Sequence, residues 1–499
     1  MRRWLPLVAI CLGTFMLLLD VTIVNVALPA ITVDLNTTFS SLQWVIDIYA
    51  LVLAALLLGA GSLSDLVGRR TVYLAGLVVF AAASLASGLA PNPTVLILAR
   101  AVQGVGAAAM FATTVALLNT AYSGRERGIA YGIWGAVSGA AAATGPIVGG
   151  LLTQHLSWRW IFLVNLPVSV VAIVLSLLVL DKAGGEHRAR FDPLGMLSFT
   201  GFAALLTYAF VRAGSDGWLA GSTLSLIVIG LLMLVAFVVV ERRRTDPMLD
   251  LSLFTDRRFA GVMLVALTVS MTAFGYLAYS SIWLQSVLQL SPVQAGLVFL
   301  PLSLAAFVVS AIIGRKLHGT DPRWIIGIGM LLVGIGSLAQ AILGSGSRWP
   351  ALLAGLLVVG VGVGLVTPTM TSAVMAAVPA RRGGMAAGAM NTARQLGFAF
   401  GIAVLGTILQ SRVAHVLDSH QPGSGRLAAA VSGGQTRSIL HSAPAAQRGG
   451  LETAIHAAFA SGLNTIFAVA GIIAVAVGLS ALVLLRPVSV PKDSPVPVA

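Results

Sequence analysis

The sequence predicts an all-α integral membrane protein with fourteen transmembrane helices. Of its 499 residues, 58% are hydrophobic and 9% are charged, whereas soluble proteins carry about 25% charged residues. The hydrophobic residues form continuous runs of roughly 20, which is the length of helix that crosses ~30 Å of hydrocarbon. These runs lack the period-two alternation of barrel strands, so helices are the only spanning structure that remains.

The predicted spans follow one another along the chain with short polar breaks between them. The first run follows the basic start MRRW, as the apolar segment of a signal peptide does. The run is too long for a signal peptide, and the segment TVDLN after it lacks a small-residue cleavage site. We therefore expect this run to be retained as the first span. The fourteen predicted spans cover residues 5–28, 41–60, 71–90, 95–119, 129–153, 160–180, 193–213, 219–240, 259–284, 293–313, 324–344, 349–377, 385–410 and 457–485.

Two long polar interruptions, at residues 181–192 and 241–258, divide the spans into six, two and six. Transporters commonly pair two six-helix bundles around a site near the midplane, so fourteen unrelated helices are the weaker interpretation. Short basic turns, GSLSDLVGRR and IGRKLHGTDPR, follow the second span of each group of six. We predict two six-helix bundles with two inserted central helices. The predicted segments are 1–180 for the first bundle, 181–258 for the insertion, 259–485 for the second bundle and 486–499 for a proline-rich, disordered cytoplasmic tail.

The distribution of the basic residues along the chain is typical of a membrane protein and does not indicate a nucleic-acid-binding surface. The chain has 30 Lys and Arg against 17 Asp and Glu, a net charge of +13. With the N-terminus in the cytoplasm, 21 of the 30 basic residues lie in inner segments, seven lie outside and two lie within spans. Four of the seven outer residues belong to one long loop, which counts little in the positive-inside rule. We therefore expect both termini in the cytoplasm and no nucleic-acid partner.

Only two of the 17 acidic residues lie within predicted spans, Asp20 in LLLDVTIVNVALP and Asp47 in WVIDIY. An ionisable group in the hydrocarbon costs about 2.5 to 3.5 kcal/mol on insertion scales, so such groups face a bundle interior or a water-filled cavity. Arg100, in LILARAVQG, lies at a similar depth, because the three residues stand about eight, six and five positions from the predicted outer ends of their spans. We expect the three side chains to form one carboxylate–guanidinium cluster.

This cluster has two interpretations. It is either a static ion pair that orders the helices or a proton site, because two acids around one arginine leave an odd carboxylate that can hold a proton. A second buried cation, Arg394 in MNTARQLG, lies ~15 Å from the cytoplasmic end of its span and is too deep to reach the interface easily. We expect Arg394 to meet a substrate, a lipid or backbone carbonyls, with Asn391 as a further substrate contact.

The sequence offers little support for enzymatic chemistry. It has no GxxxxGK[ST] loop for ATP. None of its seven histidines lies in the core of a span, so nothing resembles a set of nucleophile, base or metal ligands within the membrane. The single cysteine, Cys11, permits neither an intramolecular disulfide nor a metal cluster. We predict that the protein is not an enzyme and uses no cofactor or metal.

The longest predicted outer loop covers residues 411–455 and is rich in small and polar residues. A loop of this length without strong periodicity is either functional or disordered. It holds three histidines, with a fourth at its edge, so a pH or metal sensor is one interpretation. We favour a solvated loop or a loose helical hairpin. The four histidines are His415, His420, His441 and His456.

Five motifs in the expected order resemble the major facilitator superfamily, and specifically its fourteen-span bacterial drug and proton antiporters. They are LDVTIVNVALP, GSLSDLVGRR, LILARAVQG, GPIVGG and WRWIFLVNLP. In the fifth span, small residues permit close helix contact and Pro146 predicts a bend. The resemblance implies alternating access, with charge contacts in the loop after span two and a seal at the span-five bend. The gating residues that it implies are Gly61, Asp65, Gly68, Arg69, Arg70, Gly145, Pro146, Gly149 and Gly150.

The resemblance also implies a proton-coupled exporter of hydrophobic, cationic drugs in the bacterial cytoplasmic membrane. Asp20 and Asp47 would be alternately protonated, and Arg100 would tune them. WVIDIY is especially similar to the quaternary-ammonium exporters, whereas the acids that some relatives use for divalent cations are missing from spans ten and thirteen. The predicted substrate contacts are Asp20, Asp47, Trp44, Phe15, Phe111, Tyr279, Asn391 and Arg394.

The expected partners are protons, lipophilic small molecules and membrane lipids, and the expected state is a monomer driven by the proton gradient alone. Two other functions remain open. The first is proton-coupled export of an endogenous molecule such as an antibiotic, siderophore, lipid or amino acid by the same machinery. The second is a membrane scaffold or sensor that transports nothing, which has less need of two buried acids.

Overall fold

The computed structural model describes residues 2–180, 192–244, 247–316, 321–378, 383–419 and 425–486. These residues form helices and no strands, which confirms the all-α prediction for this part of the chain. Thirteen helical stretches in it are long and apolar enough to cross a membrane. Helix α5 (Gly124–His155, 32 residues) covers the remaining predicted span, but several of its side chains are not described. The count of fourteen spans therefore stays a prediction.

The first group of helices packs into one bundle that precedes the predicted insertion. Its helices begin where the sequence supplies caps: the Thr38 hydroxyl accepts a hydrogen bond from the Ser41 amide, and Asn92 caps the next proline-led helix in the same way. Besides α5, the bundle contains the short 3₁₀ turn η1 (Arg2–Trp4), α1 (Leu5–Leu35), α2 (Phe39–Val67), α3 (Arg69–Gly88), α4 (Pro93–Ala121), α6 (Trp160–Leu163) and α7 (Asn165–Val179).

A second bundle follows the insertion and packs mainly against itself. Three predicted single spans, 160–180, 259–284 and 293–313, are each divided into shorter helices, which continuous hydrophobicity does not reveal. The bundle contains η2 (Leu251–Thr255), α10 (Arg257–Phe274), α11 (Leu277–Ile282), the π-helical η3 (Trp283–Val287), α12 (Pro292–Val298), α13 (Leu300–Lys316), α14 (Pro322–Gln340), η4 (Trp349–Leu352), α15 (Leu353–Ala376), α16 (Gly383–Asp418) and α19 (Ala445–Leu484).

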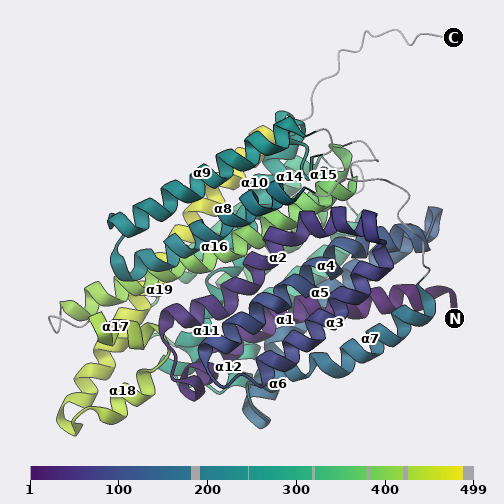
Figure 1. Ribbon diagram of the computed structural model, residues 1–499. Helices are drawn as coiled ribbons and strands as arrows, with labels where there is room; N and C mark the ends of the chain where they lie inside the picture. Colours follow the sequence, from purple (N-terminus) through teal and green to yellow (C-terminus); the bar gives the residue numbers. More distant parts are fainter. Residues whose placement is uncertain are drawn as a thin grey trace, which may run out of the picture.

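The inserted pair, α8 (Pro193–Asp216) and α9 (Gly221–Arg243), lies over the line where the two bundles meet (Figure 1). Helix α8 packs against α2 of the first bundle and against α16 of the second. On one side the rings of Trp44 and Tyr208 lie 6.0 Å apart. On the other side the Thr407 hydroxyl donates to the backbone carbonyl of Phe210 over 2.7 Å. The insertion is therefore attached to both bundles.

The predicted solvated loop at 411–455 is wrong for most of its length. Helix α16 continues to Asp418, α17 (Gly425–Ser432) and α18 (Thr436–Ser442) follow, and α19 begins at Ala445. Several side chains of this segment are buried, because α17 packs against α2, α16 and α19. The alternative of a helical hairpin is closer to the structure. Predicted features at 181–191, at 420–424 (with His420) and in the tail after Arg486 lie outside the described residues.

The helices give the molecule two distinct ends (Figure 1). The start of α1 and the end of α19 lie toward one end, which we call the termini end. Helices α17 and α18 lie at the other, which we call the α17–α18 end. At the α17–α18 end, Gln435 of the segment between these helices donates to the backbone carbonyl of Thr37 in the first bundle, over 3.2 Å. This segment therefore ties the second bundle to the first.

Candidate functional site

Asp20 and Arg100 meet in the interior of the first bundle, as the sequence predicts. Asp20 comes from α1 and is completely buried, and Arg100 comes from α4 and is 1% exposed. Nη1 of Arg100 forms an ion pair with Oδ2 of Asp20. Gln103, on the same face of α4 one turn later, links the two, because its Oε1 accepts from Arg100 over 2.8 Å and its Nε2 donates to Oδ1 of Asp20 over 2.9 Å.

Two further helices complete this network around Asp20. Ser84 of α3 accepts a hydrogen bond from Nε2 of Gln103 over 2.9 Å. Asn165, at the start of α7, donates from Nδ2 to Asp20 Oδ1 and to the Ser84 hydroxyl, each over 3.4 Å. All four side chains are at most 1% exposed. The carboxylate of Asp20 thus accepts hydrogen bonds from three different side chains.

The guanidinium of Arg100 is held from its remaining sides by α2 and by an aromatic ring of α6. Its Nε donates to the backbone carbonyl of Val45 over 3.2 Å. Its carbon Cζ lies 4.3 Å from the centre of the Tyr49 ring and 5.6 Å from that of Phe162, within the range of cation–π attraction. The buried charge is therefore offset by a carboxylate, two carbonyl oxygens and two ring faces.

Asp47 does not join this network, so the predicted three-residue cluster is wrong in that member. It lies on α2 and is completely buried. Neither of its carboxyl oxygens has a hydrogen-bond partner among the described residues. The nitrogens of Arg100 are directed instead to Asp20, Gln103 and the carbonyl of Val45. Depth along the membrane placed the acids at one level, but it gave no information on which face of α2 carries Asp47.

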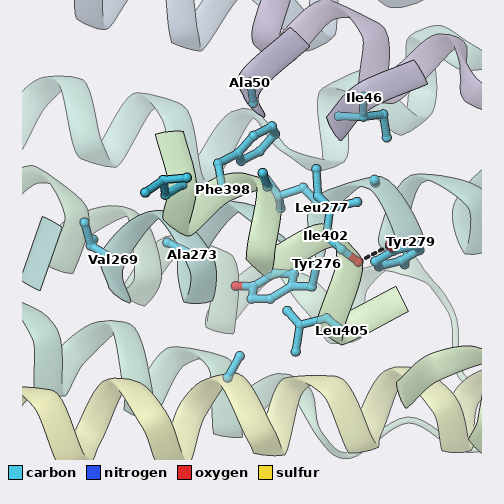
Figure 2. Close-up of a cluster of buried hydrophobic side chains, with 14 of the residues drawn as sticks. Ile46, Ala50, Val269, Ala273, Tyr276, Leu277, Tyr279, Phe398, Ile402 and Leu405 are labelled. Atoms are coloured by element: carbon cyan, nitrogen blue, oxygen red, sulfur yellow. Dashed lines mark hydrogen bonds between the residues drawn. The ribbon is translucent and has the colours of Figure 1, made fainter. Parts of the chain in front are cut away.

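Close to Asp47, α2 is hydrogen-bonded to the second bundle. Gln43, one helical turn earlier, donates from Nε2 to the Tyr279 hydroxyl over 3.0 Å and to the backbone carbonyl of Ile402 over 3.3 Å. The Tyr279 hydroxyl donates to the same carbonyl over 2.5 Å. Figure 2 shows this bond within a cluster of apolar side chains from α2, α10, α11 and α16. Tyr279, predicted as a substrate contact, is here a buried contact between bundles.

The glycines of the fifth-span motif fall on two faces of α5. Gly145 and Gly149 pack against α1, where a side chain on Gly145 would collide with Thr22. A Cβ on Gly149 would lie 2.7 Å from the backbone oxygen of Ile23. These two positions therefore permit close contact inside the first bundle, as small residues do in membrane helices.

The other two residues of the motif face the second bundle. A Cβ on Gly150 would lie 2.7 Å from the backbone oxygen of Pro292, at the start of α12. The backbone of Pro146 packs directly on Gly296, where no Cβ would fit. This backbone-to-backbone contact joins the bundles toward the α17–α18 end. The bend predicted at Pro146, which lies inside α5, stays a prediction.

The predicted gating residues after the second span lie around the junction of α2 and α3. Gly61 borders open space, because a Cβ on this residue would meet nothing within 4 Å. Gly68 joins the two helices with φ of 101°, a conformation that favours glycine. The side chain of Asp65 lies outside the described part of the chain. The charge contact predicted for Asp65 therefore stays a prediction.

The two arginines of this loop bind neighbouring helices of the first bundle. Nη1 of Arg69 donates to the Thr120 hydroxyl near the end of α4 over 3.4 Å. Nη2 of Arg70 donates to the backbone carbonyl of Leu177 in α7 over 2.7 Å. Both contacts lie at helix ends, where unpaired carbonyl and hydroxyl oxygens attract cations. They hold the α2–α3 junction against its own bundle.

The remaining predicted substrate contacts lie on four helices, α1, α2, α4 and α16. They are half-buried, and two cavities of about 480 and 460 Å³ have none of them in their lining. Phe15 and Trp44 pack against one hydrophobic core and Phe111 against another. Arg394 makes no hydrogen bond or ion pair with the described residues, and its predicted contact with a ligand stays a prediction. The half-buried set is Phe15, Trp44, Phe111, Asn391 and Arg394.

Sequence reasoning missed four polar side chains that the structure places at the site. Gln103 stands three residues after Arg100, and this helical spacing was a usable signal. Asn165 is a polar residue in the apolar stretch WRWIFLVNLP. Ser84 and Gln43 gave no comparable signal, because uncharged polar residues are common in membrane helices and only the fold shows what they meet.

Comparison with known protein families gives one match over most of the chain. The model of the Major Facilitator Superfamily matches residues 10–402. This range begins in α1 and ends in α16, so it includes Asp20, Arg100, the fifth-span motif and the insertion.

Three curated proteins are similar to this chain over most of its length. The puromycin resistance protein pur8 of Streptomyces alboniger is 40% identical over 84% of this chain and 84% of its own length. The multidrug resistance protein Stp of Mycobacterium tuberculosis is 38% identical over 83% of this chain and 78% of its own. The multidrug efflux pump LfrA of Mycolicibacterium smegmatis is 31% identical over 95% of each chain.

Among solved structures, the fold resembles a bacterial homologue of the human lysosomal transporter Spinster in an inward-facing, unoccupied conformation. The TM-score is 0.66 with 15% sequence identity, and the match covers 97% of both chains. At this identity the likeness concerns the fold alone. The helical architecture is therefore that of a known membrane transporter.

Proposed function

We propose, from the premise that this chain belongs to the major facilitator superfamily, that it is a multidrug efflux transporter driven by protons. It would expel hydrophobic, cationic small molecules in exchange for protons that enter the cell. The names of Stp and LfrA, which cover most of this chain, support multidrug efflux. The family and these relatives are transporters, which supports a role in transport rather than in catalysis.

The observation that carries proton coupling is the burial of two carboxylic acids in the first bundle. Asp20 and Asp47 are both completely inaccessible, and among the described residues only Asp20 has a cationic partner. Ionisable groups in membrane spans are costly and mark ion pathways and proton relays. A protein that needed only a rigid scaffold would gain nothing from the unpaired acid.

The proposed cycle is alternating access between the two bundles. The α17–α18 end, which we assign to the outside, is joined across the bundles by α5 and α12 and by the segment after α17. The termini end, where the basic residues gather, would face the cytoplasm. We place the protein in the bacterial inner membrane as a monomer with protons, lipophilic molecules and lipids as its partners and no cofactor.

Purified protein in liposomes with an imposed pH gradient tests the proposed function. Ethidium, a lipophilic cation, should accumulate in the lumen only when the lumen is acidic and the protein is present. Asp20→Asn and Asp47→Asn should each abolish this accumulation, whereas Glu452→Gln, which removes an exposed carboxylate, should leave it intact. Accumulation that is indifferent to the gradient, or that survives both substitutions, would refute proton coupling through these acids.

Export of an endogenous antibiotic is the second candidate function. It is favoured by pur8, whose name records resistance to puromycin and which shares 40% of its residues with this chain over most of its length. The same liposomes distinguish the two functions. A multidrug transporter should move several unrelated cations and show mutual competition, whereas a dedicated exporter should move one compound and ignore ethidium.

A further inference from the structure

Asp20 and Asp47 have opposite hydrogen-bonding environments in this conformation. Asp20 accepts hydrogen bonds from Arg100, Gln103 and Asn165 at its two oxygens. Three donors, one of them a guanidinium, are the surroundings that suit a carboxylate ion. Asp47 is equally buried and has no partner for either oxygen among the described residues. A lone carboxylate in such surroundings carries a large desolvation cost, so Asp47 is neutral and holds a proton.

The neutral acid stands beside the hydrogen bonds that join the bundles. Gln43 is four residues before Asp47, so both lie on one face of α2. Gln43 donates to Tyr279 and to the carbonyl of Ile402, and Tyr279 donates to that carbonyl as well. We call these three bonds the Gln43–Tyr279–Ile402 latch. Gln43 belongs to the first bundle, and the other two residues belong to α11 and α16 of the second.

Both donors of the latch would bind an ionised Asp47 in preference to their present acceptor. A hydrogen bond to a carboxylate is roughly twice as strong as one to a neutral carbonyl. The Tyr279 hydroxyl lies 3.0 Å from Nε2 of Gln43, which is one helical turn from Asp47 on α2. In the neutral state Asp47 offers a weaker acceptor, and the donors remain on Ile402.

We propose that Asp47 carries the exchanged proton and that its ionisation releases the Gln43–Tyr279–Ile402 latch, so that the bundles separate at the α17–α18 end. The O–H proton of Asp47 passes to water, and its carboxylate then accepts hydrogen bonds from Tyr279 and Gln43. The carbonyl of Ile402 loses both donors. Reprotonation reverses each step. Asp20 stays ionised throughout as the counter-ion of Arg100. This mechanism rests on the proposed function.

The effect of the proton on the latch has the sign that exchange of a drug for a proton requires. A proton on Asp47 favours the arrangement closed at the α17–α18 end. Loss of that proton to the cytoplasm, together with drug binding, then favours opening to the outside, where the drug leaves and a proton returns. Because a latched transporter cannot open outward while protonated, one proton enters the cell for each outward opening.

The charged groups on neighbouring elements leave Asp47 free to respond alone. None of them forms a hydrogen bond or ion pair with Asp47 among the described residues. The Arg100 and Asp20 charges are paired with each other, and Arg212 on α8 is paired with Asp216. The titratable and charged side chains on the helices packed against α2 are Cys11, Asp20 and Asp34 of α1, Arg69, Arg70 and Tyr73 of α3, Arg100 of α4, Tyr208, Arg212 and Asp216 of α8, Arg394, Arg412, His415 and Asp418 of α16 and Arg426 of α17.

The distance between the bundles at the α17–α18 end tests the proposal without any drug. Spin labels on Thr94→Cys, at the start of α4, and Ser345→Cys, in the α14–α15 connection, report that distance in a Cys11→Ser background. Both positions are exposed. Pulsed electron paramagnetic resonance at acidic and alkaline pH should give a short distance that lengthens as the pH rises.

Variants of Asp47 and Asp20 show which acid causes the lengthening of this distance with rising pH, which we call the pH step. Asp47→Asn should keep the short distance at both pH values, because the amide mimics the protonated acid. Asp20→Asn combined with Arg100→Met, which removes both charges of the ion pair, should keep the pH step. A pH step that persists in Asp47→Asn, or that disappears in the double variant, would overturn the assignment.

Tyr279→Phe and Gln43→Leu test the latch itself. Each substitution weakens the latch by about 0.5 to 1.5 kcal/mol, so at acidic pH the ratio of long to short distances should rise about two- to twelvefold. Tyr276→Phe is the matched control, because this neighbouring buried hydroxyl binds Gln340 within the second bundle. An equal effect of Tyr276→Phe, or none of Tyr279→Phe and Gln43→Leu, would refute the latch. If the pH step stands but liposomes transport no drug, the latch survives and the proposed function fails.

Discussion

At the scale of the residue, Asp20 and Asp47 of the first bundle are equally buried but differ in their hydrogen-bond partners. Asp20 lies among Arg100, Gln103 and Asn165, and each of its oxygens has at least one donor. Asp47 lies where no donor of the described residues reaches it. Removing one member of a buried ion pair leaves an unpaired charge and costs about 3 to 5 kcal/mol. The ion pair of Asp20 therefore contributes to folding, while the environment of Asp47 suits a group that changes its charge.

The ion pair predicts a stability difference between single and double substitutions. Asp20→Asn should lower the apparent free energy of unfolding by about 3 to 5 kcal/mol, because Arg100 would remain buried without a counter-ion. Asp20→Asn with Arg100→Met removes both charges and should recover most of that loss without restoring transport. Thermal unfolding in detergent measures both variants. A single variant as stable as the wild type would show that water reaches Arg100.

At the scale of the element, α5 joins the bundles through backbone contact. Its motif GPIVGG places Gly145 and Gly149 against α1 and places Pro146 and Gly150 against α12. The absence of side chains at Gly150 and Gly296 allows the two helices to touch. Larger residues at such contacts push helices apart or force strained rotamers, at a cost of about 1 to 3 kcal/mol. The motif thus acts on the contact between the bundles as well as inside one of them.

Gly150→Val should weaken the closed arrangement at the α17–α18 end. Its side chain would meet the backbone of Pro292, so the equilibrium between closed and open states should move toward open by about 1 to 3 kcal/mol. Labelling of a cysteine at Gln154, a residue of α5 whose side chain accepts a hydrogen bond from the Val293 amide of α12, should become faster. Gly135→Val on the same helix is the matched control, because Gly135 has no neighbour within 4 Å. Equal labelling rates in the two variants would contradict this account of the motif.

The connection between α17 and α18 depends on a glycine. Gly434 has φ of 88° and lies close to the Ser286 hydroxyl of η3. A left-handed conformation costs other residues about 1 to 2 kcal/mol. Gly434→Ala should therefore raise the hydrogen-exchange rate of residues 425–442, by destabilising their packing on the bundles. Gly425→Ala, where nothing lies within 4 Å, should leave this rate unchanged. Unchanged exchange in Gly434→Ala would show that the segment is held by other contacts.

At the scale of the whole molecule, the inserted helices and the α17–α18 segment connect two bundles that must move relative to each other. Helix α8 packs on α2 and α16, which are also the helices that carry Gln43 and Ile402. The segment after α17 reaches the first bundle through Gln435. Both attachments lie on the line where the bundles meet, so any opening at the α17–α18 end has to rearrange them. The insertion is therefore placed to influence the motion, although it contains neither Asp20 nor Asp47.

The basic residues predict the orientation of the molecule in the membrane. In cells that carry Cys11→Ser, a membrane-impermeant maleimide should label Ser442→Cys of α18 at once and Ser252→Cys of η2 only after permeabilisation. Both positions are exposed. Cells with Cys11 alone should remain unlabelled, because this thiol is 7% exposed within α1. The opposite labelling pattern would reverse the assigned topology.

Much of the architecture could be predicted from hydrophobicity, since most spans were located within a few residues. Interruptions inside three spans, 160–180, 259–284 and 293–313, were not predicted, because a helix break within an apolar run leaves no mark in its mean hydropathy. The helices at 425–442 were not predicted as such, because their small residues lack strong amphipathic periodicity. They are stabilised by packing on α2, α16 and α19.

The sequence by itself determined the membrane class, the two acids that lie within predicted spans and the similar depth of Asp20 and Arg100. These follow from composition and from distance along a helix, which are properties of the chain alone. Only the tertiary structure decided that Arg100 binds one acid and leaves Asp47 without a partner among the described residues. It also brought Gln43 to Tyr279, 236 positions away in the chain. The reason is physical: depth fixes one coordinate of a side chain, whereas its neighbours depend on the rotation and packing of every helix around it.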